Sequence, residues 1–291
     1  MKKNKTSWIV HIVFILFSLM CIIPLMIIVS ASFSSVESIS YHGFSVWPKE
    51  FDLSAYRYLF ETPSLILNGY AVTIFITVVG TFLAVMVMSM AGYALSRPNC
   101  IFKNILNFYI YFTTLFSGGL TSSYIINTKY LGFVDNIWVM IIPGLVSVMH
   151  VFMLRTFFKQ LPDGLFDAAK IDGASEIRIY FSIALTLSKP VVATVAFLGA
   201  LGRWNEWNSA MLYIRTPEKR PLQYILQRMM MNIQELLDSM NTLETVSTNE
   251  ALPGENLRMA LLVVCIGPVM FFFPFFQKYF TKGMTVGAVK G

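Results

Sequence analysis

The sequence predicts an all-α polytopic membrane protein with six transmembrane helices, on the basis of its composition and charge distribution. Of the 291 residues, 56% are hydrophobic and 13% are charged, whereas about a quarter of the residues of a soluble domain are charged. The charges also cluster, leaving six uncharged runs: 6–36, 62–96, 104–128, 136–154, 190–202 and 259–277. Each run holds most or all of the roughly 20 apolar residues that a transmembrane helix needs. Because backbone groups in lipid must be hydrogen-bonded internally, each run is expected to be helical.

The first run resembles a signal peptide, because MKKNK precedes an apolar stretch that ends near the small residues of VSAS. The apolar stretch from Trp8 to Ala31 is, however, long for a signal-peptide core. We therefore expect a retained first span at 8–31 in a single transmembrane domain that covers 1–291. The remaining approximate spans are expected at 64–90, 105–126, 137–155, 189–211 and 258–280.

Six spans divide the connecting segments into two sets that face opposite sides of the membrane. The termini, 96–104 and 155–189 together carry a formal charge of +9, whereas 31–62, 126–136 and 203–258 together carry −3. Because basic residues are enriched in cytoplasmic segments, the N- and C-termini and a loop at 156–188 are expected in the cytoplasm. The segment 213–256 is then an extracytoplasmic loop. The net charge of +6 reflects this topology and does not indicate nucleic-acid binding.

The sequence contains no recognisable catalytic, metal or nucleotide motif. Its three cysteines and three histidines are scattered and match no disulfide framework or metal-ligand spacing. A GxxxxGK[ST] phosphate-binding loop is missing, and the uncharged spans offer no ionisable relay near their centres. Arg203 and Glu206 are expected at the outer end of the fifth span, three residues apart on one helix face, where they could pair. Uphill transport would therefore need energy from another subunit.

The cytoplasmic loop contains the run LPDGLFDAAKIDGASEIRIYFSIALTLSKP, which predicts a compact helix–turn–helix. Pro162 and Asp163 form the expected helix start, because an aspartate accepts hydrogen bonds from free backbone N–H groups. The sequence break at Asp172-Gly173 ends this helix, and Ser175 is expected to cap the next one. The apolar side of the first helix consists of Leu165, Phe166, Ala169 and Ile171. A small rigid knob of this kind suits a part that transmits force from a partner.

This loop resembles the EAA loop of ABC-importer permeases, in which Glu-Ala-Ala is followed by Asp-Gly-Ala and a later Pro. The resemblance implies a type I ABC-importer permease fold, in which the loop is a coupling helix that docks in a cleft of a cytoplasmic ATPase. Asp167 replaces Glu with a shorter reach, and Thr186 stands where Pro is common, so the second helix is expected to kink less. The matching residues are Asp167, Ala168, Ala169, Asp172, Gly173, Ala174 and Pro190.

The resemblance covers most of 8–291 and extends to the carbohydrate-importer branch, in the subunit akin to the maltose-system G-type permease. WNEWN and the ending QKYFTKGMTVGAVKG carry that match. FSGGL at 116–120 and PLQYILQRMMMNI at 221–233 are closest to permeases for complex oligosaccharides, such as alginate and rhamnogalacturonan importers. The resemblance implies one permease subunit of an ATP-driven oligosaccharide importer in the bacterial cytoplasmic membrane, with uronate-bearing sugars fitting the nearest relatives.

The partners implied by the resemblance are a homologous second permease, two copies of the ATPase and an extracytoplasmic substrate-binding protein. ATP and magnesium would bind the ATPase, so this chain would hold no cofactor and would not be an enzyme. A gradient-driven carrier or passive channel without an ATPase is the alternative class. The uncharged spans and the cytoplasmic knob argue against that alternative.

RWNEWN at 203–208 is the candidate substrate pathway, because aromatic faces cover the C–H side of a sugar ring and amides hydrogen-bond its hydroxyls. On one helix Trp204 would share a face with Trp207 and with Asn208. We therefore expect Trp204, Asn205, Trp207 and Asn208 to line the path near its outer end. An interfacial aromatic belt is an equally open interpretation.

Three further segments carry expectations. In 213–256, apolar residues from Leu222 to Ile233 repeat at helical spacing, and 236–256 is expected to contact the binding protein or to be a solvated connector. Gly118 and Gly119 permit close helix packing, the favoured interpretation, or a local break. The basic C-terminal tail is expected to be flexible and to bind anionic membrane lipid or, by resemblance, to reach the ATPase dimer interface.

Overall fold

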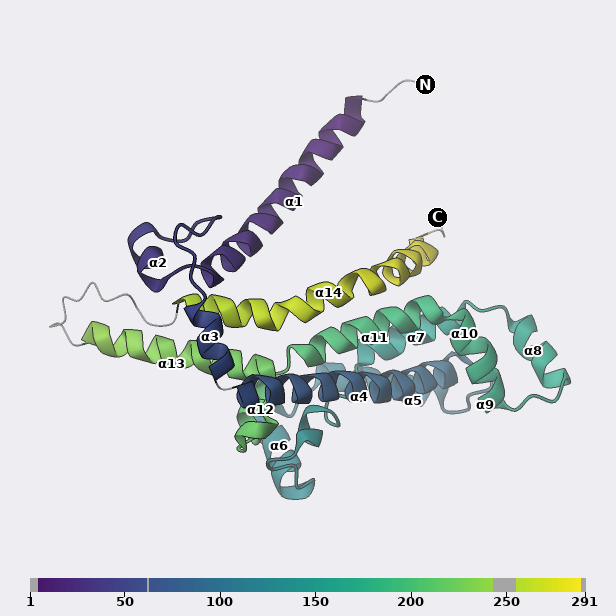
Figure 1. Ribbon diagram of the computed structural model, residues 1–291. Coiled ribbons are helices and arrows are strands. Elements are labelled where there is room, and N and C mark those ends of the chain that lie inside the picture. The colour runs from purple at the N-terminus through teal and green to yellow at the C-terminus, as the bar shows by residue number, and fades with distance from the viewer. Residues whose placement is uncertain (1–4, 62, 243–254, 289–291) are drawn as a thin grey trace. The chain divides into compact units, whose positions relative to one another are not determined.

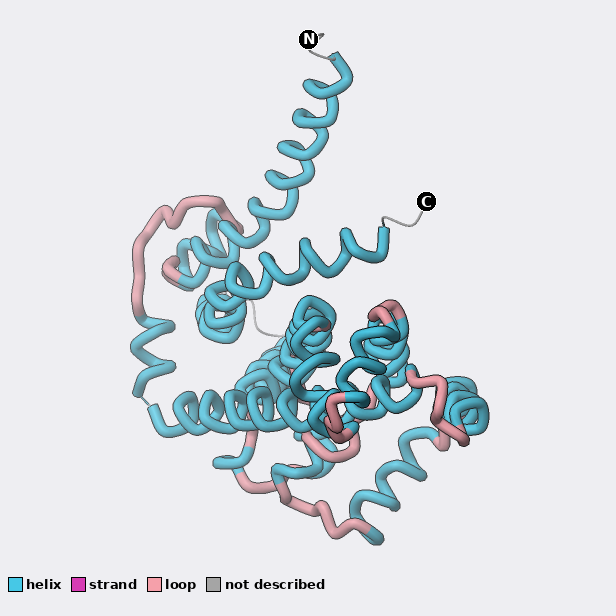
Figure 2. Tube along the Cα trace, turned by 90° about the vertical axis from the view of Figure 1, so that its right-hand side faces the viewer, coloured by secondary structure: helices cyan, strands magenta, loops and turns pink. Residues whose placement is uncertain are grey.

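The computed structural model describes residues 5–61, 63–242 and 255–288 (Figures 1 and 2). Within these ranges every regular element is a helix, and strand pairing is limited to one isolated bridge between Ser34 and Phe51. The chain forms two compact units. Unit 1 comprises residues 1–67 and 225–268, and unit 2 comprises 68–224 and 269–291.

Unit 1 contains the first long apolar helix, most of which is exposed. It contains α1 (Lys5–Ser32), α2 (Val36–His42), α3 (Ser54–Glu61), most of α13 (Leu222–Thr242) and the start of α14 (Glu255–Ala288). Its buried polar anchor is Asn256, whose amide donates to the Ser34 carbonyl and to the Ser54 hydroxyl, both at 3.4 Å. These bonds tie the start of α14 to the segment that follows α1.

Unit 2 holds most of α4 (Pro63–Ser96) and the helices that follow it. They are α5 (Lys103–Leu115), α6 (Gly119–Ile125), α7 (Val148–Lys159), α8 (Asp163–Ile171), α9 (Glu176–Ile179), α10 (Leu185–Leu187), α11 (Lys189–Trp204) and α12 (Asn208–Tyr213). Two π-helical turns, η1 (Ile126–Tyr130) and η3 (Tyr180–Ala184), and two 3₁₀ turns, η2 (Ile137–Met140) and η4 (Pro217–Lys219), complete it. In Figure 1, α8 projects beyond α9 and α10 at one end of this unit.

The core of unit 2 forms where α4 packs against α7. Leu154 and Phe158 of α7 are fully buried in a cluster with Met88 and Tyr93 of α4. At Gly92 a Cβ atom would lie only 3.0 Å from the Leu154 Cβ, so the two helices approach closely. A second buried cluster joins the first half of α4 to η2, α12 and Ile214. These clusters fix both halves of α4 within the unit.

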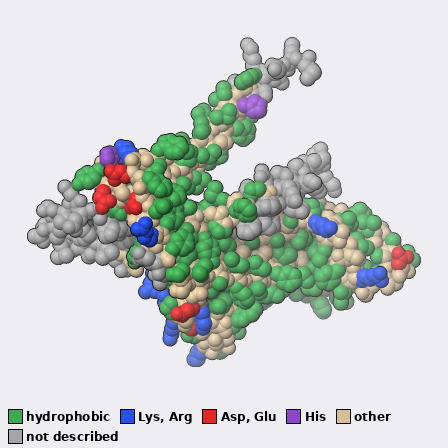
Figure 3. All heavy atoms as spheres, in the orientation of Figure 1, with side chains coloured by type: hydrophobic (Ala, Val, Ile, Leu, Met, Phe, Trp, Pro, Cys, Tyr) green, Lys and Arg blue, Asp and Glu red, His purple; other side chains and the backbone are tan. Residues whose placement is uncertain are grey.

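Within the residues that the structure describes, two helices are long and apolar enough to cross a membrane, namely Val10–Ser32 and Pro63–Ser96. A third candidate is the pair Glu176–Leu187 and Lys189–Trp204, which meet at an angle of 84°. The chain stays helical through Thr186, as expected, and the bend falls at Ser188. Among the described residues, hydrophobic side chains cover the middle of unit 2 on the face in Figure 3, and charged side chains gather towards its ends. Such a surface is suited to lipid or to an apolar partner.

The expectation of one continuous helix for each predicted span is wrong for three spans. The predicted spans 105–126, 137–155 and 189–211 are interrupted at 116–118, 141–147 and 205–207. Each interruption coincides with residues that weaken a helix, namely FSGG, the pair Pro143-Gly144, and the polar residues of WNEWN. A count of apolar residues is insensitive to these breaks. Membrane crossing by these segments stays a prediction.

Candidate functional site

The helix α8 of the loop at 156–188 packs on the core of unit 2 through a buried aromatic ring. Phe166 is 4% exposed and belongs to the same buried cluster as Phe158. The guanidinium carbon of Arg97, one residue beyond α4, lies 3.7 Å from the centre of the Phe166 ring. Arg97 also donates a 3.0 Å hydrogen bond to the Phe158 carbonyl. The ring and the guanidinium together connect α8 to the end of α4 and to α7.

The start of α8 differs from the expected cap. Pro162 occupies the cap position, and Asp163 is the first helical residue, with no side-chain cap hydrogen bond. The Asp163 carboxylate instead faces Arg97 at 3.8 Å. Because Pro162 takes the extended backbone conformation of a cap residue, Asp163 lies one position too late to accept from the first-turn N–H groups. Its charge still favours the N-terminal end of the helix.

A second set of polar contacts joins α8, α9 and α4. Glu176 accepts from the Tyr93 hydroxyl at 3.0 Å and pairs with Lys170 at 2.8 Å. The hydroxyls of Ser89 and Tyr180 hydrogen-bond at 2.6 Å. Residues of the loop therefore contact two successive turns of the second half of α4, at Ser89 and Tyr93. A displacement of α8 would be transmitted to α4 through these contacts.

Six of the seven residues that match the EAA pattern, all except Pro190, lie on two sides of the helix–turn–helix formed by α8 and α9. Ala169 and Ala174 are half-buried against the core cluster, whereas Asp167, Ala168, Asp172 and Gly173 are exposed. Gly173 has φ +76°, in the left-handed region that glycine favours, and Ser175 caps α9 by accepting from the Arg178 N–H at 3.4 Å. The predicted turn and this cap are thus confirmed.

The predicted apolar side of α8 is divided between two faces. Phe166 and Ala169 face the core, whereas Leu165 and Ile171 are 43% and 86% exposed. Ile177 of α9 is 70% exposed as well. The outward face of the knob therefore combines exposed aliphatic side chains with carboxylates, a combination suited to a protein partner.

The prediction that RWNEWN forms one helical face is wrong. Helix α11 ends at Trp204 and α12 begins at Asn208, so Trp204 and Trp207 lie on opposite sides of a break. The Asn205 amide donates to the Leu201 carbonyl at 2.9 Å, and the Glu206 carboxylate accepts from the Ser209 N–H at 2.8 Å. These side chains satisfy the backbone at the break. A role of Trp204, Asn205, Trp207 and Asn208 in the substrate path stays a prediction.

Arg203 also departs from expectation. It forms no ion pair with Glu206 in the part of the chain that the structure describes. It lies in the last turn of α11, at the end of this helix as expected, and its side chain packs against Gly80 at the middle of α4. The uncharged run of α4 did not indicate this contact, because a long side chain can reach a neighbouring helix. The depth of Arg203 in the membrane stays a prediction.

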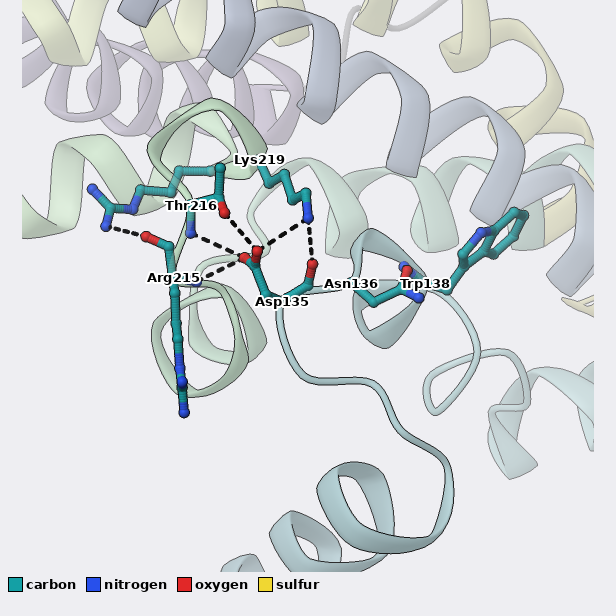
Figure 4. A network of polar contacts seen from close by, with 7 residues as sticks. Asp135, Asn136, Trp138, Arg215, Thr216 and Lys219 are labelled. Carbon is teal, nitrogen blue, oxygen red and sulfur yellow. Dashed lines mark hydrogen bonds and ion pairs between the residues drawn. The ribbon is translucent and has the colours of Figure 1, made fainter.

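A polar network that the sequence did not predict is centred on Asp135 (Figure 4). Its carboxylate accepts from the N–H groups of Arg215 and Thr216, each at 3.0 Å, and from the Thr216 hydroxyl. Lys219 donates to the same carboxylate at 3.1 Å and to the Asp135 carbonyl at 2.6 Å. These hydrogen bonds hold the pKa of Asp135 well below its usual range. They join 126–136 to 213–219, the two segments of unit 2 expected outside the cell.

The sequence signal for this network is the pair Asp135-Asn136, because such residues are common in turns. Asp135 has φ +53°, a conformation in which Asp and Asn are enriched. Next to the network is a cavity of about 380 Å³ lined by Phe75, Trp138, Asn136 and Lys219 among others. Within the described residues no group of His, Cys, Asp or Glu side chains is suited to hold a metal ion.

The remaining predicted segments have mixed outcomes. Gly118 and Gly119 mark a break between α5 and α6, with no close packing at Gly119 among the described residues. Beyond the break, Tyr124 stacks on Tyr213 at 5.5 Å and Asn127 donates to its hydroxyl at 3.0 Å.

The predictions for the last loop and for the C-terminal tail also have different outcomes. The repeat that starts at Leu222 forms α13, as predicted. The tail expected to be flexible is helical through Ala288, because it continues α14. Most of 236–256 lies outside the described residues.

No family model matches this chain. It is 34% identical over 100% of both chains to the polygalacturonan/rhamnogalacturonan transport system permease protein YtcP of Bacillus subtilis. It is 38% identical to protein LplC of the same organism, over 93% of this chain and 90% of LplC. A crystal structure of a bacterial ABC transporter involved in import of the acidic polysaccharide alginate contains a similar chain, with a TM-score of 0.81 and 29% identity over 96% of this chain and 98% of that one.

The all-helical fold, the apolar helices and the structural match together define a membrane-embedded ABC transporter permease. The full-length similarity then specifies the branch. This chain belongs to the family of carbohydrate ABC transport permeases.

Proposed function

We propose that the chain is one permease subunit of an ATP-driven importer of oligosaccharides in the bacterial cytoplasmic membrane. The full-length similarity to YtcP, a permease of a polygalacturonan and rhamnogalacturonan transport system, supports oligosaccharides derived from acidic polysaccharides. The similarity to a chain of the alginate importer supports the same class. As a transport subunit, the chain catalyses no reaction of its own.

The proposed topology has six spans with both termini in the cytoplasm. The helices Val10–Ser32 and Pro63–Ser96 are two of these spans. The interrupted segments 105–126, 137–155 and 189–211 and the start of α14 supply the other four. Interrupted segments are compatible with a membrane protein where they are buried in protein or line a cavity. The charge difference between the two sets of loops supports this orientation.

The proposed partners are a homologous second permease, two ATPase subunits that bind ATP and magnesium, and an extracytoplasmic binding protein. The observation that carries the coupling role is the attachment of α8 to α4 through Phe166 and Arg97. Closure of the ATPase dimer would move α8, and α4 would move with it. Asp167, Ala168 and Asp172 would face the ATPase, and Gly173 would form the turn.

The test is ATPase activity of the purified complex in lipid nanodiscs, with and without the binding protein. Gly173→Val places a β-branched residue at φ +76°, which disrupts the turn. Gly164→Ala, in α8, is the matched control. The Cβ atom that it adds would have no described neighbour within 4 Å. We expect Gly173→Val to abolish stimulation by the binding protein or release the ATPase, and Gly164→Ala to behave as wild type. Stimulation retained in Gly173→Val would show that the loop is only a linker.

A further inference from the structure

Arg203 places a guanidinium group at the middle of a candidate transmembrane helix. A Cβ atom added to Gly80 would lie 2.4 Å from Nε and 2.7 Å from Cδ of Arg203. The side chain therefore packs directly on the backbone of α4. Gly80 is central in this helix, which runs from Pro63 to Ser96. If α4 crosses the bilayer, the positive charge of Arg203 lies near the centre of the membrane.

The hydrogen-bond acceptors of Arg203 are backbone carbonyl groups, and the Glu206 carboxylate acts on its charge only through space. Nη1 donates to the Gly199 carbonyl at 3.3 Å, and Nη2 donates to the Gly144 carbonyl at 3.0 Å. Nε is buried with no acceptor. The ion pairs found among the described residues do not include Arg203, and the Glu206 carboxylate caps α12 through Ser209.

An arginine held in this way is costly at membrane depth. Carbonyl dipoles orient a guanidinium group, and the Glu206 carboxylate acts on it through space without forming an ion pair. Charged residues within membrane spans usually mark the pathway of a substrate or ion. Gly80 has no side chain that would prevent Arg203 from reaching α4. A neutral donor could make the same hydrogen bonds to the two carbonyl groups. The positive charge at this place therefore indicates a role beyond holding the helices together.

The surroundings of Arg203 are suited to a ligand that approaches from outside this chain. Gly144 lies in the 141–147 interruption, and Arg203 directly precedes the break at 205–207. Irregular backbone at membrane depth is tolerated where it lines a cavity or is buried in protein. Gly144 is exposed, so the Nη2 end of the guanidinium group lies at an accessible surface. Nε, at the other side, is packed against α4.

We propose that Arg203 binds carboxylate groups of the transported sugar, which makes uronate-bearing oligosaccharides the substrate class. A guanidinium group matches a carboxylate in charge and in geometry, because its N–H groups form a planar fork. As the oligosaccharide passes through the permease, its uronate residues would bind Arg203 one after another. This inference rests on the proposed function as an oligosaccharide importer.

The test compares two sugars with the same backbone, in one of which methyl esters replace the charged carboxylates. The complete importer, with its ATPase and binding protein, is reconstituted in proteoliposomes, and the import rates of trigalacturonate and of its fully methyl-esterified form are measured. The ratio of the two rates is compared between variants and wild type. Because the binding protein is identical in every sample, its own selectivity cancels in this comparison.

Two substitutions at Arg203 separate charge from hydrogen bonding. Arg203→Gln keeps a donor and removes the charge, and we expect it to lower the acid-to-ester ratio by about tenfold or more, the loss typical of removing a charge-assisted bond. Arg203→Lys keeps the charge and should retain most of the ratio. Gly80→Ala should also lower the ratio, because the added Cβ displaces Arg203 while the charge remains. Arg57→Gln, a substitution on an exposed face of α3, is the matched control.

Each result bears on the proposal in a defined way. A selective loss of trigalacturonate import in Arg203→Gln supports it. An equal loss for both sugars would assign Arg203 to holding the interrupted helices together, and no loss would remove it from the pathway. Either result overturns the carboxylate site while leaving the importer intact. Import of neither sugar by wild type would instead overturn the proposed function, and this site with it.

Discussion

Replacement of Phe166 by alanine should detach α8 from the rest of the permease. Phe166 is 4% exposed, and Phe→Ala at a buried site costs about 3–5 kcal/mol. The contact with Arg97, at 3.7 Å from the ring centre, accounts for about 0.5–1 kcal/mol of this at a partly exposed site. Because α8 is a single short helix at the edge of the core, we take the lower value, about 3 kcal/mol. That loss corresponds to a roughly 100-fold increase in the population in which α8 is detached from the core.

The measurement is hydrogen–deuterium exchange of the α8 amides in the detergent-solubilised complex without nucleotide. Leu165→Ala is the matched control, because Leu165 is the preceding residue and is 43% exposed. It should change the opening free energy by about 0.5 kcal/mol, roughly twofold in rate. By contrast, Leu165→Ala should weaken co-purification of the ATPase, because its side chain faces outwards. Equal exchange in Phe166→Ala and Leu165→Ala would refute the argument that Phe166 anchors the helix.

Three further substitutions test the packing of unit 2. Gly92→Ala should lower the melting temperature of the permease, because the new Cβ meets Leu154 at 3.0 Å and overpacking costs about 1–3 kcal/mol, whereas Gly202→Ala, with open space around it, should not. Tyr180→Phe removes the 2.6 Å bond to Ser89 and should cost about 1 kcal/mol in chemical unfolding. Asp135→Asn should destabilise the permease at neutral pH. It should also remove the loss of stability that wild type shows as the pH falls below about 4. The folded pKa of Asp135 is lowered, so its stabilisation is present above the unfolded pKa and is lost on acidification through the folded pKa.

The sequence determined the class of protein and the local conformation of the loop at 156–188. Long uncharged runs require a lipid environment and a helical backbone, so the two long spans were predictable within a few residues. The turn at Gly173 and the cap at Ser175 were predictable too. Both depend on the types of residue within a few positions of each other, and these can be read from the sequence.

Only the tertiary structure decided where the helices break and which distant residues meet. The helical spacing within RWNEWN gave no warning that α11 ends at Trp204. Arg203 meets Gly80 across 123 positions of the sequence, as counted from their residue numbers, and Asp135 meets Lys219 between two separate loops. Local patterns specify the conformation of a segment, because they depend on nearby residues. They do not specify which segments pack together, because those contacts depend on the folded path of the whole chain.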